Sequence, residues 1–175
     1  MRVKKITELD RISIEKFKEA KKTPLIVVLD NIRSLNNIGA VFRTSDAFLL
    51  EAVYLCGITA CPPNAEIHKT ALGAENSVDW CYYENTENAI KELKEKNFIL
   101  CAIEQAESSI MLNDLILDTT KKYAIVLGNE VKGVRQEVVD MCDCCIEIPQ
   151  FGTKHSLNVS VAGGIVIWEF FRQLQ

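Results

Sequence analysis

No stretch of the sequence is apolar for long enough to cross a lipid bilayer. Apolar runs such as residues 25–29 and 163–168 fall far short of the roughly 20 residues that a membrane-spanning helix needs. The first 22 residues mix charged with apolar side chains and contain no apolar core of a secretory signal. The sequence therefore predicts a cytoplasmic protein without a membrane partner.

Histidine is scarce, and the cysteines form no disulfide framework. The seven cysteines are an odd number scattered through apolar segments, as expected of free thiols in a reducing compartment. The only two histidines, His68 and His155, lie outside the cysteine cluster at residues 142–145. We therefore expect small buried thiols and no metal site.

An excess of positive charge is also missing. The formal net charge is −4, which excludes a surface that attracts nucleic acid over its whole extent. Positive charge gathers only locally, because residues 1–22 hold eight Lys or Arg against four Asp or Glu. We expect a helical extension there with Ile12, Ile14 and Phe17 turned inward, and an RNA-binding role for it stays open.

Glycine and proline are too few for a linker, and no internal repeat is present. We expect a single domain over residues 1–175, with 24–172 as its core. Short β-rich segments alternate with helical ones, and strands such as residues 25–29 are continuously apolar. This pattern predicts an α/β fold with a mainly parallel sheet of six or seven strands and helices on both faces.

Neither of the common nucleotide-binding glycine motifs follows a predicted strand, which disfavours NAD, FAD and ATP as ligands. Ligands of an open parallel sheet nevertheless bind outside the carboxyl ends of its strands. Four loops at that edge carry polar residues that the fold does not require. Their sequences are DNIRSLNN, EQAES, GNEVKG and PQFGTKHSLN.

A helix expected to begin near Asn36 brings two polar groups together. Arg43 follows Asn36 by seven residues, which is two helical turns along the same face. Its neighbours on the helix are small or apolar, so its guanidinium needs a partner. Two interpretations stay open: a structural ion pair with Asp46 or Glu130, or a functional site.

The ends of the later helices allow two interpretations as well. Asn129 and Glu130 are suited to begin one helix, and Ser156 and Asn158 are suited to begin the last one, expected over residues 157–172. Capping alone would explain these residues, but their clustering at strand ends favours a site. Apolar residues surround the last helix so widely that we expect part of it to form a homodimer seam.

Three segments in series resemble the motifs of the SpoU/TrmH family of RNA ribose 2′-O-methyltransferases, which belongs to the SPOUT superfamily. They are NNIGAVFRTSDAF, IVLGNEVKGV and IPQFGTKHSLNVSVAGGI. The resemblance covers residues 24–172 and implies a deep C-terminal trefoil knot, S-adenosylmethionine as cofactor, and a homodimer with its active site near the seam. The sequence departs from the family at Leu49, Leu50 and Val131, where glycine is frequent.

The resemblance also implies roles for individual residues. The catalytic set would be Arg43, Asn36, Glu130, Ser156 and Asn158. The cofactor would lie against Ala102, Ile103, Glu104, Leu127, Gly128, Asn129, Ile148 and Leu157. RNA would be attracted by local positive charge on Arg33, Arg43, Lys132, Arg135 and Lys154.

Methyl transfer to a ribose hydroxyl is an in-line displacement, so correct placement of the reacting groups supplies much of the rate. The resemblance assigns Arg43 as the base that deprotonates the hydroxyl. Because a guanidinium is essentially never neutral in a protein, we expect Arg43 instead to orient the ribose and its phosphate and to stabilise the developing alkoxide.

The substrate class follows only by analogy. No RNA-binding domain precedes the core, and this favours tRNA, at a D-loop guanosine, over ribosomal RNA. Three alternatives remain: a ribosomal RNA 2′-O-methyltransferase, a nucleobase methyltransferase, and a non-catalytic RNA-binding protein on the same scaffold.

Overall fold

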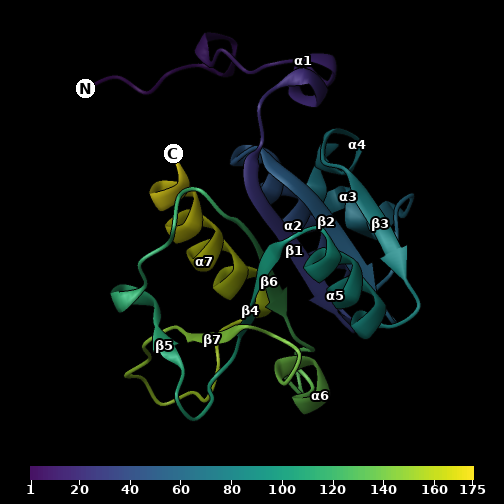
Figure 1. Cartoon of the computed structure of the whole chain (residues 1–175). Coiled ribbons are helices and arrows are strands. Elements are labelled where there is room, and N and C mark those ends of the chain that lie inside the picture. Colours follow the sequence, from purple (N-terminus) through teal and green to yellow (C-terminus); the bar gives the residue numbers. More distant parts are fainter.

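The computed structural model describes all 175 residues, apart from the side chain of Ile6, and has a single sheet at its centre (Figure 1). Seven strands pair in the order β3-β2-β1-β6-β4-β7-β5, and every pairing is parallel. The strands are β1 (Thr23–Asp30), β2 (Leu50–Cys56), β3 (Trp80–Tyr83), β4 (Phe98–Ile103), β5 (Ile110–Met111), β6 (Lys122–Leu127) and β7 (Cys144–Glu147). The predicted parallel sheet is confirmed.

Helices connect the strands. The α-helices are α1 (Ile14–Glu19), α2 (Leu35–Ala47), α3 (Ala65–Ala71), α4 (Ala74–Ser77), α5 (Thr86–Glu95), α6 (Gln136–Val139) and α7 (Val159–Leu174), and two short 3-10 helices are η1 (Ile6–Glu8) and η2 (Leu112–Asp114). Most begin at a side chain that accepts a backbone N–H, as Ser34 does for α2 and Asn85 for α5.

Two apolar cores lie on opposite faces of the sheet. Alternate residues of β1 point to opposite sides, so Val27 packs with α2 and α7 while Val28 packs with α5 and α6. Both cores are fully buried at these positions. Helices therefore cover both faces, as predicted, and the carboxyl ends of the strands are left to loops.

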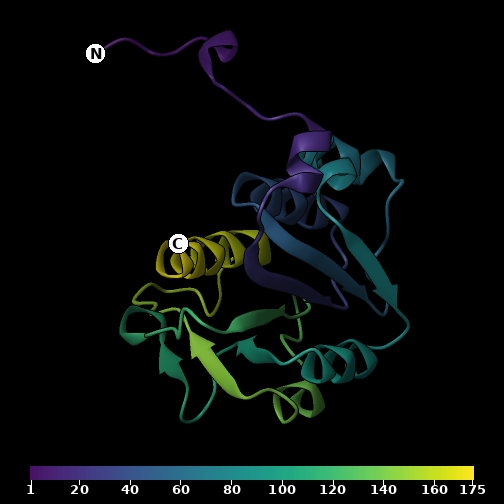
Figure 2. The same cartoon turned by 45° about the horizontal axis from the view of Figure 1, so that its top comes forward.

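The chain termini differ most from the sequence-based prediction. Residues 1–22 are α-helical only in α1, and the segment before it projects from the body in both views (Figures 1 and 2). Phe17 is buried as expected, but Ile12, which precedes α1, and Ile14, the first residue of α1, are exposed. The last helix spans Val159–Leu174 rather than 157–172.

Leu49 stands at a position where the resemblance leads us to expect glycine. It adopts a φ of 52°, in the left-handed region that glycine enters without strain.

In the residues that the structure describes, no helix is long and apolar enough to span a membrane. The trefoil knot stays a prediction.

Candidate functional site

A cavity of about 740 Å³ lies at the carboxyl ends of β4, β6 and β7. Three loops build it, one after each of these strands. Its lining comprises Ile103, Glu104, Gln105, Leu127, Gly128, Asn129, Glu130, Val131, Lys132, Gly133, Val134, Ile148, Gln150, His155, Ser156, Leu157, Asn158, Val159 and Ala162. The walls combine apolar side chains with backbone and a few polar groups, which is the usual composition of a small-molecule site.

One wall is a tight loop of seven consecutive residues, 128–134, which we call the cavity loop. Asn129 and Gly133 exchange two backbone hydrogen bonds of 3.1 and 2.8 Å, so the loop folds back on itself. The side-chain oxygen of Asn129 accepts two further N–H groups inside the turn. Gly133 has a φ of 68°, and a Cβ there would lie 2.2 Å from Oε2 of Glu104. The loop therefore requires glycine at this position.

Glu130 ties the cavity loop to the start of α2. Its two carboxylate oxygens accept the backbone N–H groups of Arg33 and Ser34 at 3.0 and 2.9 Å. The expected helix start at Asn129 and Glu130 is wrong, because Glu130 satisfies the N-terminal segment of a different helix. Burial alone would raise the pKa of Glu130, but these N–H donors outweigh it and hold the pKa below its ordinary value.

Asn37 connects three segments that are remote in sequence. Its amide nitrogen donates to Glu130 at 3.0 Å, and its amide oxygen accepts from the amide of Asn158 at 3.1 Å. Asn36, the residue chosen from the sequence, is exposed instead, because consecutive residues of a helix point about 100° apart. The structure thus places Asn37, and not Asn36, beside Glu130 and Asn158.

Asn158 also caps α7. Its side-chain oxygen accepts the N–H groups of Ser160 and Val161, so the cap is Asn158 and the expectation of Ser156 as cap is wrong. The amide is thereby fixed in both directions, toward the helix and toward Asn37. Ser156, two residues before Asn158 in the chain, lines the cavity.

Arg43 is not part of this cluster in a single chain. It is exposed on α2 and does not line the cavity. Neither expected ion pair forms: Asp46 accepts the hydroxyl of Ser77, and Glu130 is occupied by backbone donors. Among the side chains that the structure describes, none forms a hydrogen bond or ion pair with Arg43.

Comparison with known proteins bears on this arrangement. The sequence profile of the SpoU rRNA methylase family matches residues 24–168. The chain belongs to this family. The 23S rRNA (guanosine-2′-O-)-methyltransferase RlmB of Nitrosomonas europaea is 35% identical over 170 residues, which cover 96% of this chain and 64% of that protein. The tRNA (guanosine(18)-2′-O)-methyltransferase of Aquifex aeolicus is 34% identical over 158 residues, which cover 89% and 72%.

A solved structure of the family has the same fold. The AdoMet-bound rRNA methyltransferase from Sinorhizobium meliloti matches with a TM-score of 0.81 and 26% identity, covering 91% of this chain and 60% of its own. This chain therefore spans less than two thirds of the length of that enzyme and of the Nitrosomonas relative.

Most residues that the SpoU resemblance placed at the cofactor do line the cavity. They are Ile103, Glu104, Leu127, Gly128, Asn129, Ile148 and Leu157. Ala102 does not: it is fully buried within β4, where its side chain points to the opposite face from Ile103. Of the catalytic set, Glu130, Ser156 and Asn158 line the cavity, whereas Arg43 and Asn36 do not.

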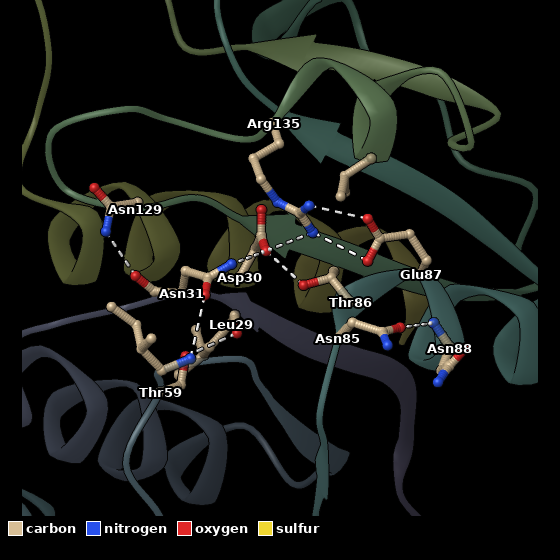
Figure 3. Close-up of polar contacts among 12 residues, drawn as sticks. Leu29, Asp30, Asn31, Thr59, Asn85, Thr86, Glu87, Asn88, Asn129 and Arg135 are labelled. Carbon is tan, nitrogen blue, oxygen red and sulfur yellow. Dashed lines mark hydrogen bonds and ion pairs between the residues drawn. The ribbon is translucent and has the colours of Figure 1, made fainter.

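The residues expected to contact RNA divide into two groups. Arg33, Lys132 and Lys154 are exposed and carry their charge into solvent. Arg135 is paired instead, with its guanidinium 2.9 Å from Glu87 and 3.6 Å from Asp30 (Figure 3). Val131, where the SpoU family often has glycine, is 78% exposed in the cavity loop.

Sequence reasoning missed several lining residues, among them Val134, Gln150 and His155. Val134 and Gln150 lie within the quoted motif segments, next to residues that were selected, but their residue types gave no signal of a contact with a ligand. His155 contributes its carbonyl oxygen to the amide of Gln105, a backbone contact that no side-chain pattern reveals. Within the described residues, no three His, Cys, Asp or Glu side chains gather closely enough to hold a metal ion.

The lowered pKa of Glu130 predicts a pH dependence of stability. A carboxylate whose pKa is depressed by folding stabilises the protein above its unfolded pKa, and this contribution is lost as the pH falls through the folded pKa. Glu130→Gln is therefore expected to melt below the wild type at pH 7 and to approach it in acid. Melting temperatures between pH 7 and pH 3 measure this. A gap between the two proteins that stays constant with pH would contradict the role of the charge.

Proposed function

We propose that this protein transfers a methyl group from S-adenosylmethionine to a ribose 2′-hydroxyl of RNA. The observation that carries the proposal is the cavity at the ends of β4, β6 and β7, joined to the cluster of Glu130, Asn37 and Asn158. Relatives of the SpoU family named as RNA 2′-O-methyltransferases support the same activity.

The lining suits S-adenosylmethionine. A volume of about 740 Å³ lies in the range of sites for ligands of this size. Ile103, Leu127, Ile148 and Leu157 offer apolar surface to a flat purine ring, and the glycines of the cavity loop bring backbone N–H and C=O groups close to it. When bound, the cofactor supplies an electrophilic methyl group on a sulfonium.

Arg43 fits this function if two copies of the chain associate. Its helix packs along α7, where Phe48 contacts Trp168 at a ring separation of 5.6 Å. Outward from this contact, α7 exposes an apolar stripe of Val161, Ile165 and Trp168, between 39% and 51% exposed. These residues recur at helical spacing on one face, so a second copy that covers them brings the exposed Arg43 of one subunit toward the cavity edge of the other.

The dimer is tested by charging the stripe. Ile165→Asp places a carboxylate in the proposed seam. The molar mass of this variant, measured by light scattering, is therefore expected to be that of one chain, whereas the wild type is expected to have the mass of two. Methyl transfer is expected to fall with it, because each site needs both subunits. Ile58→Asp is the matched control, since Ile58 is 64% exposed at a different edge of the fold. A wild type that is monomeric at micromolar concentration would contradict the seam.

Ribosomal RNA and tRNA are both candidate substrates. The Nitrosomonas relative is named for 23S rRNA and the Aquifex relative for tRNA, and several further relatives of similar identity are named for 23S rRNA. We therefore propose a guanosine ribose of ribosomal RNA as the first substrate to test, with tRNA as the second. The expected cytoplasmic location stays a prediction.

The activity is tested by transfer of tritiated methyl groups to separated ribosomal RNA and tRNA, followed by digestion to nucleosides. Label in a 2′-O-methylnucleoside supports the proposal and identifies the RNA class. Label on a base would establish a nucleobase methyltransferase instead. RNA binding without label, in a chain that binds S-adenosylmethionine, would favour a non-catalytic protein.

A further inference from the structure

Arg135 stands at the end of the cavity loop, and neither it nor its two ion-pair partners line the cavity. It directly follows Val134, the last lining residue of the loop. Its two terminal nitrogens contact the two oxygens of Glu87 at 2.9 and 3.0 Å, a bidentate arrangement that fixes the guanidinium plane (Figure 3). This pairing holds the pKa of Glu87 below its ordinary value.

The second partner of Arg135 is a buried carboxylate. Asp30 ends β1, is 1% exposed, and lies 3.6 Å from the guanidinium. One of its oxygens accepts from Asn31 and Thr86, while the other has no hydrogen-bond partner, as is also true of the buried Nε of Arg135. A buried charge left without its counter-ion is strongly unfavourable, so Asp30 keeps Arg135 where it is.

The cavity loop is thus held at three places. Asn129 and Glu130 attach its beginning to the segment that starts α2, through a 2.7 Å bond to the carbonyl of Asn31 and the N–H groups already described. Glu104 accepts the N–H of Val134 at 3.0 Å. Arg135 attaches its end to α5 and β1 through Glu87 and Asp30, neither of which lines the cavity.

We propose that Arg135 is a positioning residue, whose contacts with Glu87 and Asp30 hold the cavity loop in the shape that binds S-adenosylmethionine, and that it does not serve as an RNA contact. The inference rests on the proposed function, because it concerns the affinity of the same cavity. It replaces the sequence-based expectation that Arg135 meets RNA.

The test measures the dissociation constant of S-adenosylmethionine by calorimetry for the full chain and its variants. Arg135→Gln is expected to raise this dissociation constant about 10-fold, and Glu87→Gln about 3-fold. The double variant is expected to bind S-adenosylmethionine as tightly as Arg135→Gln alone, because the two residues share one contact. Arg135→Lys, which keeps the charge but not the bidentate geometry, is expected to fall between the wild type and Arg135→Gln. The apparent KM for total RNA stays unchanged.

Arg2→Gln is the matched control. Arg2 makes a bidentate pair with Glu8 at 2.9 and 3.1 Å in the projecting N-terminal segment, far in the fold from the cavity. Circular dichroism establishes that each variant is folded at the temperature of measurement. If Arg135→Gln does not fold, Glu87→Gln still tests the inference, because it removes the same contact from the other partner. Hydrogen exchange is expected to quicken at residues 128–134 in the folded variants.

The outcomes separate the inference from the proposed function. If the wild type binds S-adenosylmethionine and the folded Arg135 and Glu87 variants bind it equally well, the inference is overturned while the proposed function stands. A raised KM for RNA with unchanged cofactor affinity overturns it too and makes Arg135 an RNA contact. A wild type that binds no S-adenosylmethionine overturns the proposed function and this inference together.

Discussion

Gly128→Ala is expected to weaken S-adenosylmethionine binding by at least about 100-fold. A Cβ at this position would lie 2.1 Å from the backbone nitrogen of Val134 and 2.2 Å from the carbonyl carbon of Gly133. Both atoms belong to backbone that is fixed by the contacts of the cavity loop, so the side chain cannot be accommodated by a rotamer change. The cavity loop must therefore open to make room for the methyl group. The expected 100-fold loss of affinity corresponds to about 2.7 kcal/mol of binding free energy.

Gly152→Ala is the control for this variant. Gly152 lies in the loop after β7, also beside the site, and a Cβ there would meet no atom within 4 Å. Calorimetric titration of both variants, with melting temperatures as a check on folding, compares them directly. Wild-type affinity in Gly128→Ala would mean that the cavity loop is not the binding wall.

Arg43→Ala is expected to lower the rate of methyl transfer by about 10³-fold and to leave S-adenosylmethionine affinity unchanged. The rate falls because a positioned cation that stabilises a developing oxyanion contributes a factor of this size. The affinity is preserved because Arg43 does not line the cavity. Single-turnover rates and calorimetry on the same preparation separate the two effects. A variant that retains near-normal turnover would exclude Arg43 from the reaction.

Mixing the two variants tests whether Arg43 acts across the proposed dimer seam. In a heterodimer of Arg43→Ala and Gly128→Ala subunits, the intact cavity of the first would face the intact arginine of the second. Random reassociation makes half of the dimers mixed, each with one complete site, so about a quarter of wild-type activity is expected. If Arg43 served the cavity of its own subunit, the mixture would be inactive.

The fold was predictable because its signals are local. The central strands β1 and β6 contain short, continuously apolar runs, and this is enough to predict burial on both faces of a parallel sheet. The loops after β4, β6 and β7 followed from the rule that ligands bind at the carboxyl ends of strands. The two-residue strand β5 could not be predicted from the sequence, because both its residues are exposed and it pairs only with β7.

The outline of the candidate site was predictable from the sequence, but its side-chain contacts were not. The choice between Asn36 and Asn37 depends on which of two adjacent side chains faces Glu130, and a rotation of about 100° decides it. The partners of Asn37 lie 93 and 121 residues away. No spacing within a motif encodes such contacts.

By itself, the amino-acid sequence determined the parallel α/β architecture, the three family segments and most of the cavity wall, because each depends on residues that are neighbours in the chain. Only the tertiary structure decided that Glu130 secures the start of α2, that Arg135 is held by Glu87 and Asp30, and that Arg43 stands outside the cavity of its own chain. These are contacts between remote segments, and the packing of the sheet and its helices fixes their directions.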